Sequence, residues 1–219
     1  MLNSARLVVI RSILPPKWRI SRQAAAEALN RFAEVEADSA WQYYNAMYFT
    51  SDSRLTGMLF RNVVEEMGHA DAFQRVANRL SSQRFRPMFQ SRKPLVTSSP
   101  DINSFLAFAH ESERAIGGQF ATYAKACPLP EVKEVFERIA TEEVDHQLEA
   151  LVRLESLLAS PHQSGWLLFR ARLRRGLEQW ERLGEQLSAF FFGILLGAFY
   201  LVSGLFLSQY CRNAGAKRP

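Results

Sequence analysis

The sequence predicts an all-α protein whose main part is a bundle of four helices, arranged as two helical hairpins joined by one long crossover. Three observations predict this fold: apolar residues recur at helical spacing over four long stretches, a set of acids and histidines repeats at an offset of 77 positions, and turn-forming residues stand midway within each repeat. With 219 residues, of which 47% are hydrophobic and 22% charged, the chain has the composition of a folded protein.

The four helices of the bundle are expected over residues 21–50, 54–80, 101–127 and 131–158. Turn residues separate the first two helices at Thr50 to Ser53 and the last two at Cys127 to Pro130. The third helix has a start signal, because Ser99 can serve as an N-cap, Pro100 suits the first helical position and Asp101 lies near the positive end of the helix dipole.

The crossover between the hairpins is expected over residues 81–99, which contain Pro87 and Pro94 and no helical stripe. Fully extended, this segment reaches about 60 Å at roughly 3.3 Å per residue. A helix of about 27 residues is only about 40 Å long. The crossover is therefore long enough to run the whole length of the bundle.

Both ends of the chain are predicted to meet a membrane. No charged residue lies between Gln186 and Cys211, so residues 186–211 are expected to form a transmembrane helix, followed by a basic tail at 212–219. Residues 159–185 are expected to form a basic amphipathic helix in the membrane surface. Residues 1–20 form a basic amphipathic arm, which is either a second surface helix or an uncleaved targeting segment.

The apolar side of the predicted surface helix is carried by Trp166, Phe169, Leu173, Leu177 and Trp180. The net charge of +5 is concentrated at the margins of the chain and around the apolar segment, which favours anionic lipid over nucleic acid as the partner. Five arginines between 170 and 182 precede the segment, so the bundle is expected on the cytoplasmic or matrix side of a bacterial or mitochondrial inner membrane.

Small residues mark one side of the predicted transmembrane helix, at Gly193, Gly197 and Gly204. Small residues let a second helix approach closely, so a second copy or another membrane subunit is one expectation. The other is that glycine is simply common in membrane helices. The two cysteines, with no CxxC pair, exclude a disulfide framework, a zinc ribbon and thioredoxin-like or rubredoxin-like chemistry.

The repeat carries the chemistry of the chain. Two ExxH motifs lie 77 residues apart, and each has a glutamate 30 positions upstream. The six residues are Glu36, Glu66, His69, Glu113, Glu143 and His146. The positions three apart share one face of a helix. Each predicted turn lies midway between the upstream glutamate and the glutamate of the ExxH motif. The two glutamates therefore lie at the same level on neighbouring antiparallel helices.

Four carboxylates and two imidazoles converging from four helices predict a site for two metal ions, since buried carboxylates need cations to neutralise them. Iron is the expected metal and manganese the second choice. Glu111 is the competitor for the third-helix ligand, and His110 is expected to be structural. Glu65 and Glu142 each follow an arginine by four positions, so they either form ion pairs within their helices or contact the metal ligands. Asp145 is a further candidate for orienting an imidazole.

The run from Glu36 to Tyr43, together with the two ExxH motifs, resembles the ferritin-like superfamily, in particular rubrerythrins and other di-iron carboxylate proteins. The resemblance implies that Glu66 and Glu143 bridge the metals. Tyr43 is expected beside them, where it either donates a hydrogen bond to a bridging oxygen or passes an electron. Rubrerythrins carry a further glutamate where this chain has Ile116, and a rubredoxin-like site that is absent here. The ligand set is therefore closer to that of di-iron oxygenases and oxidases, including the demethoxyubiquinone hydroxylases.

The function expected from this resemblance is that of a membrane-anchored di-iron oxidase, hydroxylase or peroxidase, which reacts with dioxygen or peroxide and takes a quinol or lipid as substrate or reductant. Two alternatives stay open at the level of the sequence. One is iron handling, with ferrous iron itself oxidised as the substrate, and the other is an accessory subunit of a larger membrane complex.

Overall fold

The computed structural model describes residues 16–85 and 93–215, apart from side chains at several positions between 179 and 215. All its regular elements within this part of the chain are helices: α2 (Arg22–Met47), α3 (Ser53–Leu80), α4 (Asp101–Ala126), α5 (Pro130–Leu157) and α6 (Pro161–Gly215). The expected all-α class is confirmed. The ends of α2 to α5 fall within three residues of the predicted ends.

Local hydrogen bonds explain where two of these helices start. The Ser21 hydroxyl accepts a hydrogen bond from the Ala24 N–H, and the Asp52 carboxylate accepts from the N–H groups of Arg54 and Leu55. Both residues satisfy backbone donors that have no partner inside the helix. The predicted turn before α3 is thereby confirmed, with Asp52 as its N-cap.

The start of α4 differs from the prediction that Ser99 caps it. Pro100 directly precedes the helix and no side chain caps it. Instead the Asp101 carboxylate reaches back and accepts hydrogen bonds from the backbone N–H and the hydroxyl group of both Thr97 and Ser98. A carboxylate accepts several such bonds at once, so it holds the turn more firmly than a single serine hydroxyl would.

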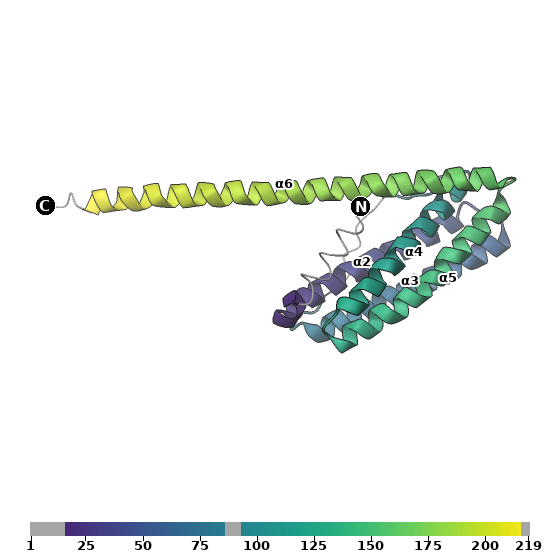
Figure 1. Ribbon diagram of the computed structural model, residues 1–219, viewed down its shortest axis with the longest axis horizontal. Helices are drawn as coiled ribbons and strands as arrows, with labels where there is room; N and C mark the ends of the chain where they lie inside the picture. Colours follow the sequence, from purple (N-terminus) through teal and green to yellow (C-terminus); the bar gives the residue numbers. More distant parts are fainter. Residues whose placement is uncertain (1–15, 86–92, 216–219) are drawn as a thin grey trace. The chain divides into compact units, whose positions relative to one another are not determined.

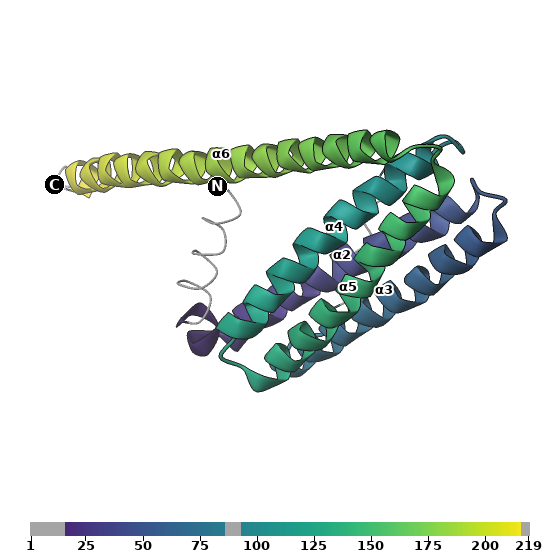
Figure 2. The ribbon, with the colours of Figure 1, turned by 45° about the vertical axis from the view of Figure 1, so that its right-hand side comes forward.

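The four helices pair as two hairpins, α2 with α3 and α4 with α5, which lie side by side in both views (Figures 1 and 2). The two ends of the crossover lie against opposite ends of α2. Ser81 donates to the Gln23 side chain near the start of α2, whereas the Leu95 N–H donates to the Gln42 side chain near its end. The segment that joins the hairpins therefore begins and ends at opposite ends of α2, and residues 86–92 within it lie outside the described residues.

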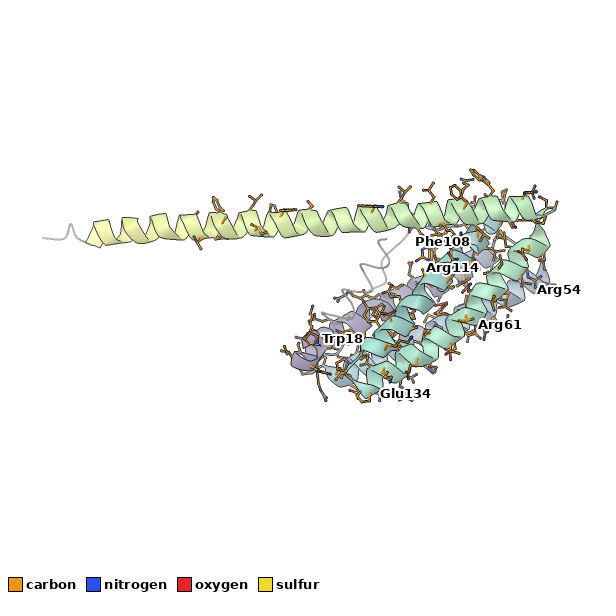
Figure 3. All side chains as sticks on the ribbon, viewed as in Figure 1. Trp18, Arg54, Arg61, Phe108, Arg114 and Glu134 are labelled. Atoms are coloured by element: carbon orange, nitrogen blue, oxygen red, sulfur yellow. The ribbon has the colours of Figure 1, made fainter. Side chains whose placement is uncertain are left out.

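The apolar core is divided into two clusters along the bundle. Both clusters consist mainly of aliphatic side chains, and the first contains more buried aromatic rings than the second. The buried aromatic residues of the first are Trp18, Phe73, Phe120 and Phe136, and the partly buried Phe32 packs against them. Trp18 and Glu134 lie at one end of the bundle and Arg54 at the other (Figure 3). The polar residues of the repeat lie between the two clusters in sequence along every helix, so the core brackets them with apolar layers.

Trp18 corrects the predicted boundary of the N-terminal arm at residue 20. Its ring is 2% exposed and stacks on Tyr123 and Phe136. Trp18 is thus part of the core of the bundle, because an indole gains more from burial among aromatic rings than from contact with water, while the residues on either side of it are exposed. The rest of the predicted arm, residues 1–15, lies outside the described residues.

The C-terminal part differs from the prediction of separate surface and membrane helices, because α6 is one helix of 55 residues. The chain divides into two compact units, Met1–Arg172 and Leu173–Pro219. In the first unit, Ser164 and Ala171 are buried and Leu167 and Leu168 pack against the second core cluster. The start of the predicted surface helix therefore belongs to the bundle, while Trp166 and Phe169 stay exposed on the remaining face.

The predicted transmembrane segment, 186–211, is helical along its length. Many of its side chains, at 186, 187, 189, 190, 202 and 205–211, lie outside the described residues. Among residues whose side chains the structure does describe, no helix presents an apolar stretch of the length that spanning a membrane requires.

Candidate metal centre

The six residues of the repeat come together in the polar layer between the two core clusters. Glu36 comes from α2, Glu66 and His69 from α3, Glu113 from α4, and Glu143 and His146 from α5. Every one of them is at most 4% exposed. The predicted convergence of these side chains is therefore what the structure shows.

The ligand atoms face one another at short range. Glu36, Glu66, His69 and Glu143 each place one such atom within 4.8 Å of the others. His146 adjoins this group, with its Nδ1 3.2 Å from Glu66 Oε1 and 3.7 Å from Glu143 Oε2. In the same way His69 Nδ1 lies 3.3 Å from Glu143 Oε1 and 3.9 Å from Glu66 Oε2. Each imidazole thus faces the ExxH glutamates of both hairpins.

The far side of each imidazole is held by a glutamate from the opposite hairpin. His69 Nε2 lies 2.7 Å from Glu142 Oε2, and His146 Nε2 lies 2.7 Å from Glu65 Oε2. A carboxylate accepts from an N–H, so Nε2 of each ring carries a proton, and Nδ1 faces the carboxylates of the cluster. These two glutamates, whose role the sequence left open, orient the candidate ligands.

Two other expectations about the surroundings of the imidazoles are not met. Arg61, the expected helical partner of Glu65, binds Glu149 on α5 instead. Asp145 does not orient the imidazole next to it in sequence, since the Nε2 of that ring is bound to Glu65. The signal that could have identified Glu65 and Glu142 is that they too are 77 positions apart.

The third-helix candidates are clearly separated. Glu111 is buried but accepts hydrogen bonds from Arg114 (2.6 Å) and Arg172 (2.7 Å), so it ties α4 to the start of α6. His110 Nδ1 donates to the backbone oxygen of Gln147 at 2.9 Å, which is the structural role expected for it. Glu113 is therefore the α4 residue that joins the cluster.

Glu113 differs from the other carboxylates in having a hydrogen-bond donor. The Tyr43 hydroxyl donates to Glu113 Oε1 at 3.1 Å, which places the tyrosine beside the cluster as expected. One turn further along α4, Gly117 allows close contact with α5. A Cβ atom at Gly117 would lie 3.3 Å from the Cβ of Glu143, so the glycine lets these two helices approach beside the cluster.

The charges of the cluster strongly perturb one another. Burial, reinforced by the neighbouring Glu66, raises the pKa of Glu36 well above its usual value, and burial with Glu143 does the same for Glu113. Burial opposes the charged form of His146, but the adjacent Glu143 and Glu66 outweigh it and raise its pKa to about 12. In the absence of other cations, protons therefore have to balance the buried carboxylates.

The cluster lacks partners for atoms that should not be buried alone. Among the described residues, eleven buried side-chain nitrogen and oxygen atoms have no hydrogen-bond partner. Eight of these belong to the cluster: both oxygens of Glu36, Glu66 and Glu143, and the Nδ1 atoms of His69 and His146. Such groups are costly to leave unpaired. The donor set suits a metal ion, which would give these atoms partners together.

Comparison of the chain with protein-family models, curated proteins and solved structures finds no match. The resemblance to ferritin-like proteins therefore remains a prediction from the sequence motifs. What is established is a helical bundle with a buried carboxylate and histidine cluster that could hold metal.

Proposed function

We propose that this cluster binds two metal ions, with iron as the resident metal and manganese as the alternative. The observation that carries the proposal is the convergence, from three helices, of eight buried ligand atoms that have no hydrogen-bond partner. Proteins rarely leave one such atom without a hydrogen bond, and a cation accepts electron pairs from carboxylate oxygens and imidazole nitrogens together.

The distances support an assignment of ligands to the two positions. Glu66 and Glu143 face both imidazoles, which is the placement required of carboxylates that bridge two ions. Glu36 and His69 complete one position, and Glu113 and His146 complete the other. This division follows the two halves of the repeat, and four carboxylates would balance the charge of two divalent cations.

The reaction proposed for the site is oxidation or hydroxylation of an organic molecule with dioxygen or peroxide. A pair of irons held by carboxylates and histidines supplies the electrons for reducing such oxidants. The chain itself contributes the ligands, fixes the imidazoles through Glu65 and Glu142, and excludes water with the apolar clusters on either side. The resemblance to di-iron oxidases and oxygenases supports the same reaction class.

We also propose that the molecule acts on a lipid-soluble partner at a membrane. The charge-free segment 186–211 and its basic flanks support membrane attachment. A second support is the row of exposed apolar residues on α3 and α5, each between 46% and 66% exposed: Phe60, Val64, Met67, Val144, Leu148 and Val152. Met67 and Val144 directly follow Glu66 and Glu143, so this apolar surface lies on the helices that carry the site.

The proposed reaction is tested with the full chain loaded anaerobically with ferrous iron and reconstituted in vesicles that contain a quinol. Addition of oxygen or hydrogen peroxide should oxidise the quinol catalytically, over many turnovers per chain. Glu66→Ala and His146→Ala should abolish turnover while circular dichroism shows an intact helical fold. Glu149→Ala, which removes an acid from α5 outside the cluster, should keep it. Equal turnover in all four proteins would refute the proposal.

Glu142→Gln and Glu65→Gln are expected to weaken metal binding about 10- to 100-fold each, because a neutral amide oxygen accepts more weakly than a carboxylate and so lowers the basicity of the imidazole. Competition with a chromophoric chelator measures the change. Glu149→Gln is the matched control on the same helix as Glu142, since its partner is Arg61 rather than a histidine. Equal affinities in the three variants would show that Glu65 and Glu142 do not act on the ligands.

A further inference from the structure

The two halves of the cluster are not equivalent, although the sequence repeat makes their ligands the same. Seven residues after Glu36 stands Tyr43, whereas seven residues after Glu113 stands Phe120. Only one of the two rings carries a hydroxyl group. Tyr43 is 2% exposed and its ring packs edge-on against Phe105, with the ring centres 5.4 Å apart, so the position of its hydroxyl is fixed by the core.

This hydroxyl reaches one upstream glutamate and not the other. It donates to Glu113 Oε1 at 3.1 Å, and neither oxygen of Glu113 is among the buried atoms that lack a partner. Both oxygens of Glu36 are buried and have none. Phe120, in the matching position, packs among Phe32, Phe73 and Phe136 and offers no donor. One upstream glutamate therefore accepts a hydrogen bond from the tyrosine, and the other accepts none.

We infer that Tyr43 makes the two metal positions unequal, so that a cation fills the Glu36–His69 position first and the Glu113–His146 position second. The inference rests on the proposed function, because it assumes that the cluster binds metal. A cation at Glu36 meets oxygens that accept no hydrogen bond from a hydroxyl group, within a group of four residues already gathered inside 4.8 Å. A cation at Glu113 has to compete with the Tyr43 hydroxyl for Oε1.

Repulsion between two cations would weaken the second step even in a symmetric site, so unequal affinities alone do not test the inference. The discriminating quantity is the change in the second dissociation constant when the hydroxyl is removed. A hydrogen bond to a charged group is worth enough for its loss to change an equilibrium about tenfold or more. Tyr43→Phe removes only one oxygen atom and keeps the ring in its place.

The experiment is a calorimetric titration of the metal-free full chain with Co²⁺, which does not react with oxygen on this timescale and is therefore a pure binding probe. The wild type should bind two ions in two steps. In Tyr43→Phe the second step should tighten about tenfold, while the first changes less than twofold. Tyr44→Phe is the matched control, since its hydroxyl pairs with Tyr48 instead of the cluster, and both its steps should equal those of the wild type.

A second pair of variants assigns the order without relying on Tyr43. Glu36→Gln should remove the tight step and leave the weak one, and Glu113→Gln should do the reverse. Two bound ions with a second step unchanged or weakened in Tyr43→Phe would overturn the inference and leave the metal site standing. The same holds if Glu113→Gln removes the tight step. A wild type that binds no Co²⁺, Fe²⁺ or Mn²⁺ would instead refute the proposed function itself.

Discussion

Metal-free protein carrying Glu36→Leu should be more stable than metal-free wild type, whereas the metal-loaded wild type should be the most stable of all. Glu36 is 1% exposed, both of its oxygens lack partners, and its nearest charged neighbour is another carboxylate, Glu66. Replacing such a group by an apolar side chain of similar size should raise the free energy of unfolding by about 1–3 kcal/mol. An ordinary substitution in a core lowers the free energy of unfolding, whereas Glu36→Leu should raise it when no metal is bound.

Metal binding should add stability only where the site is complete. A ligand present at about a thousand times its dissociation constant stabilises the folded state by about 4 kcal/mol per site. Thermal unfolding with and without a chelator measures this gain, which should be large in the wild type and much reduced in Glu36→Leu. Glu27→Leu, at an exposed position of α2, should behave as the wild type. If chelation leaves the wild-type unfolding temperature unchanged, the cluster is not a metal site.

Phe136→Ala should destabilise the bundle by about 3–5 kcal/mol, a large part of the stability of an ordinary domain. Phe136 is fully buried and contacts other aromatic rings with centres 5.1 to 6.4 Å away. Those partners are Trp18, Phe32, Phe73, Phe120 and Tyr123. Removing the ring opens a cavity where these neighbours meet, and rigid rings cannot collapse to fill it.

Chemical denaturation of metal-free protein measures this loss without a contribution from bound cations. Phe60→Ala is the control, because its side chain is 57% exposed and its removal leaves no cavity. It should change the free energy of unfolding by less than about 1 kcal/mol. A loss of that same small size for Phe136→Ala would mean that the aromatic cluster does not form the centre of the core.

The fold and the six clustered residues could be predicted because the geometry of a helical hairpin constrains the sequence directly. An ExxH motif needs a shared helix face, and the upstream glutamate needs an antiparallel helix whose turn lies midway. Both constraints leave a spacing that can be counted along the chain. The same spacing located the turn that Asp52 caps and the turn at Cys127 to Pro130.

The interactions between helices could not be predicted in this way. The spacing along the chain shows that Arg61 can reach Glu65 within one helix. It does not show whether His146, on another helix, lies closer to Glu65. The structure shows that the imidazole is the partner of Glu65 and that Arg61 turns to Glu149. Choices of this kind depend on the height and rotation of neighbouring helices, which periodicity alone does not specify.

The continuity of α6 was missed for a different reason. The change near residue 186 from an amphipathic to an apolar pattern suggested a boundary between two helices. No proline interrupts the helix after Pro161, and a change in the side-chain pattern does not require a break in the backbone. Trp18 lies outside the predicted bundle, yet its side chain is buried in the core, because one aromatic residue by itself gives no periodic pattern in the sequence.

The number of metal ions that one chain retains shows whether the cluster is a site for two cations. Full-length protein is loaded anaerobically with ferrous iron, freed of excess metal on a desalting column and analysed for iron and protein together. We expect two ions per chain in the wild type, and loss of tight binding in a Glu66→Ala variant that remains helical. A wild type that retains no iron, or a variant that retains as much as the wild type, would mean that the cluster is not a di-metal site.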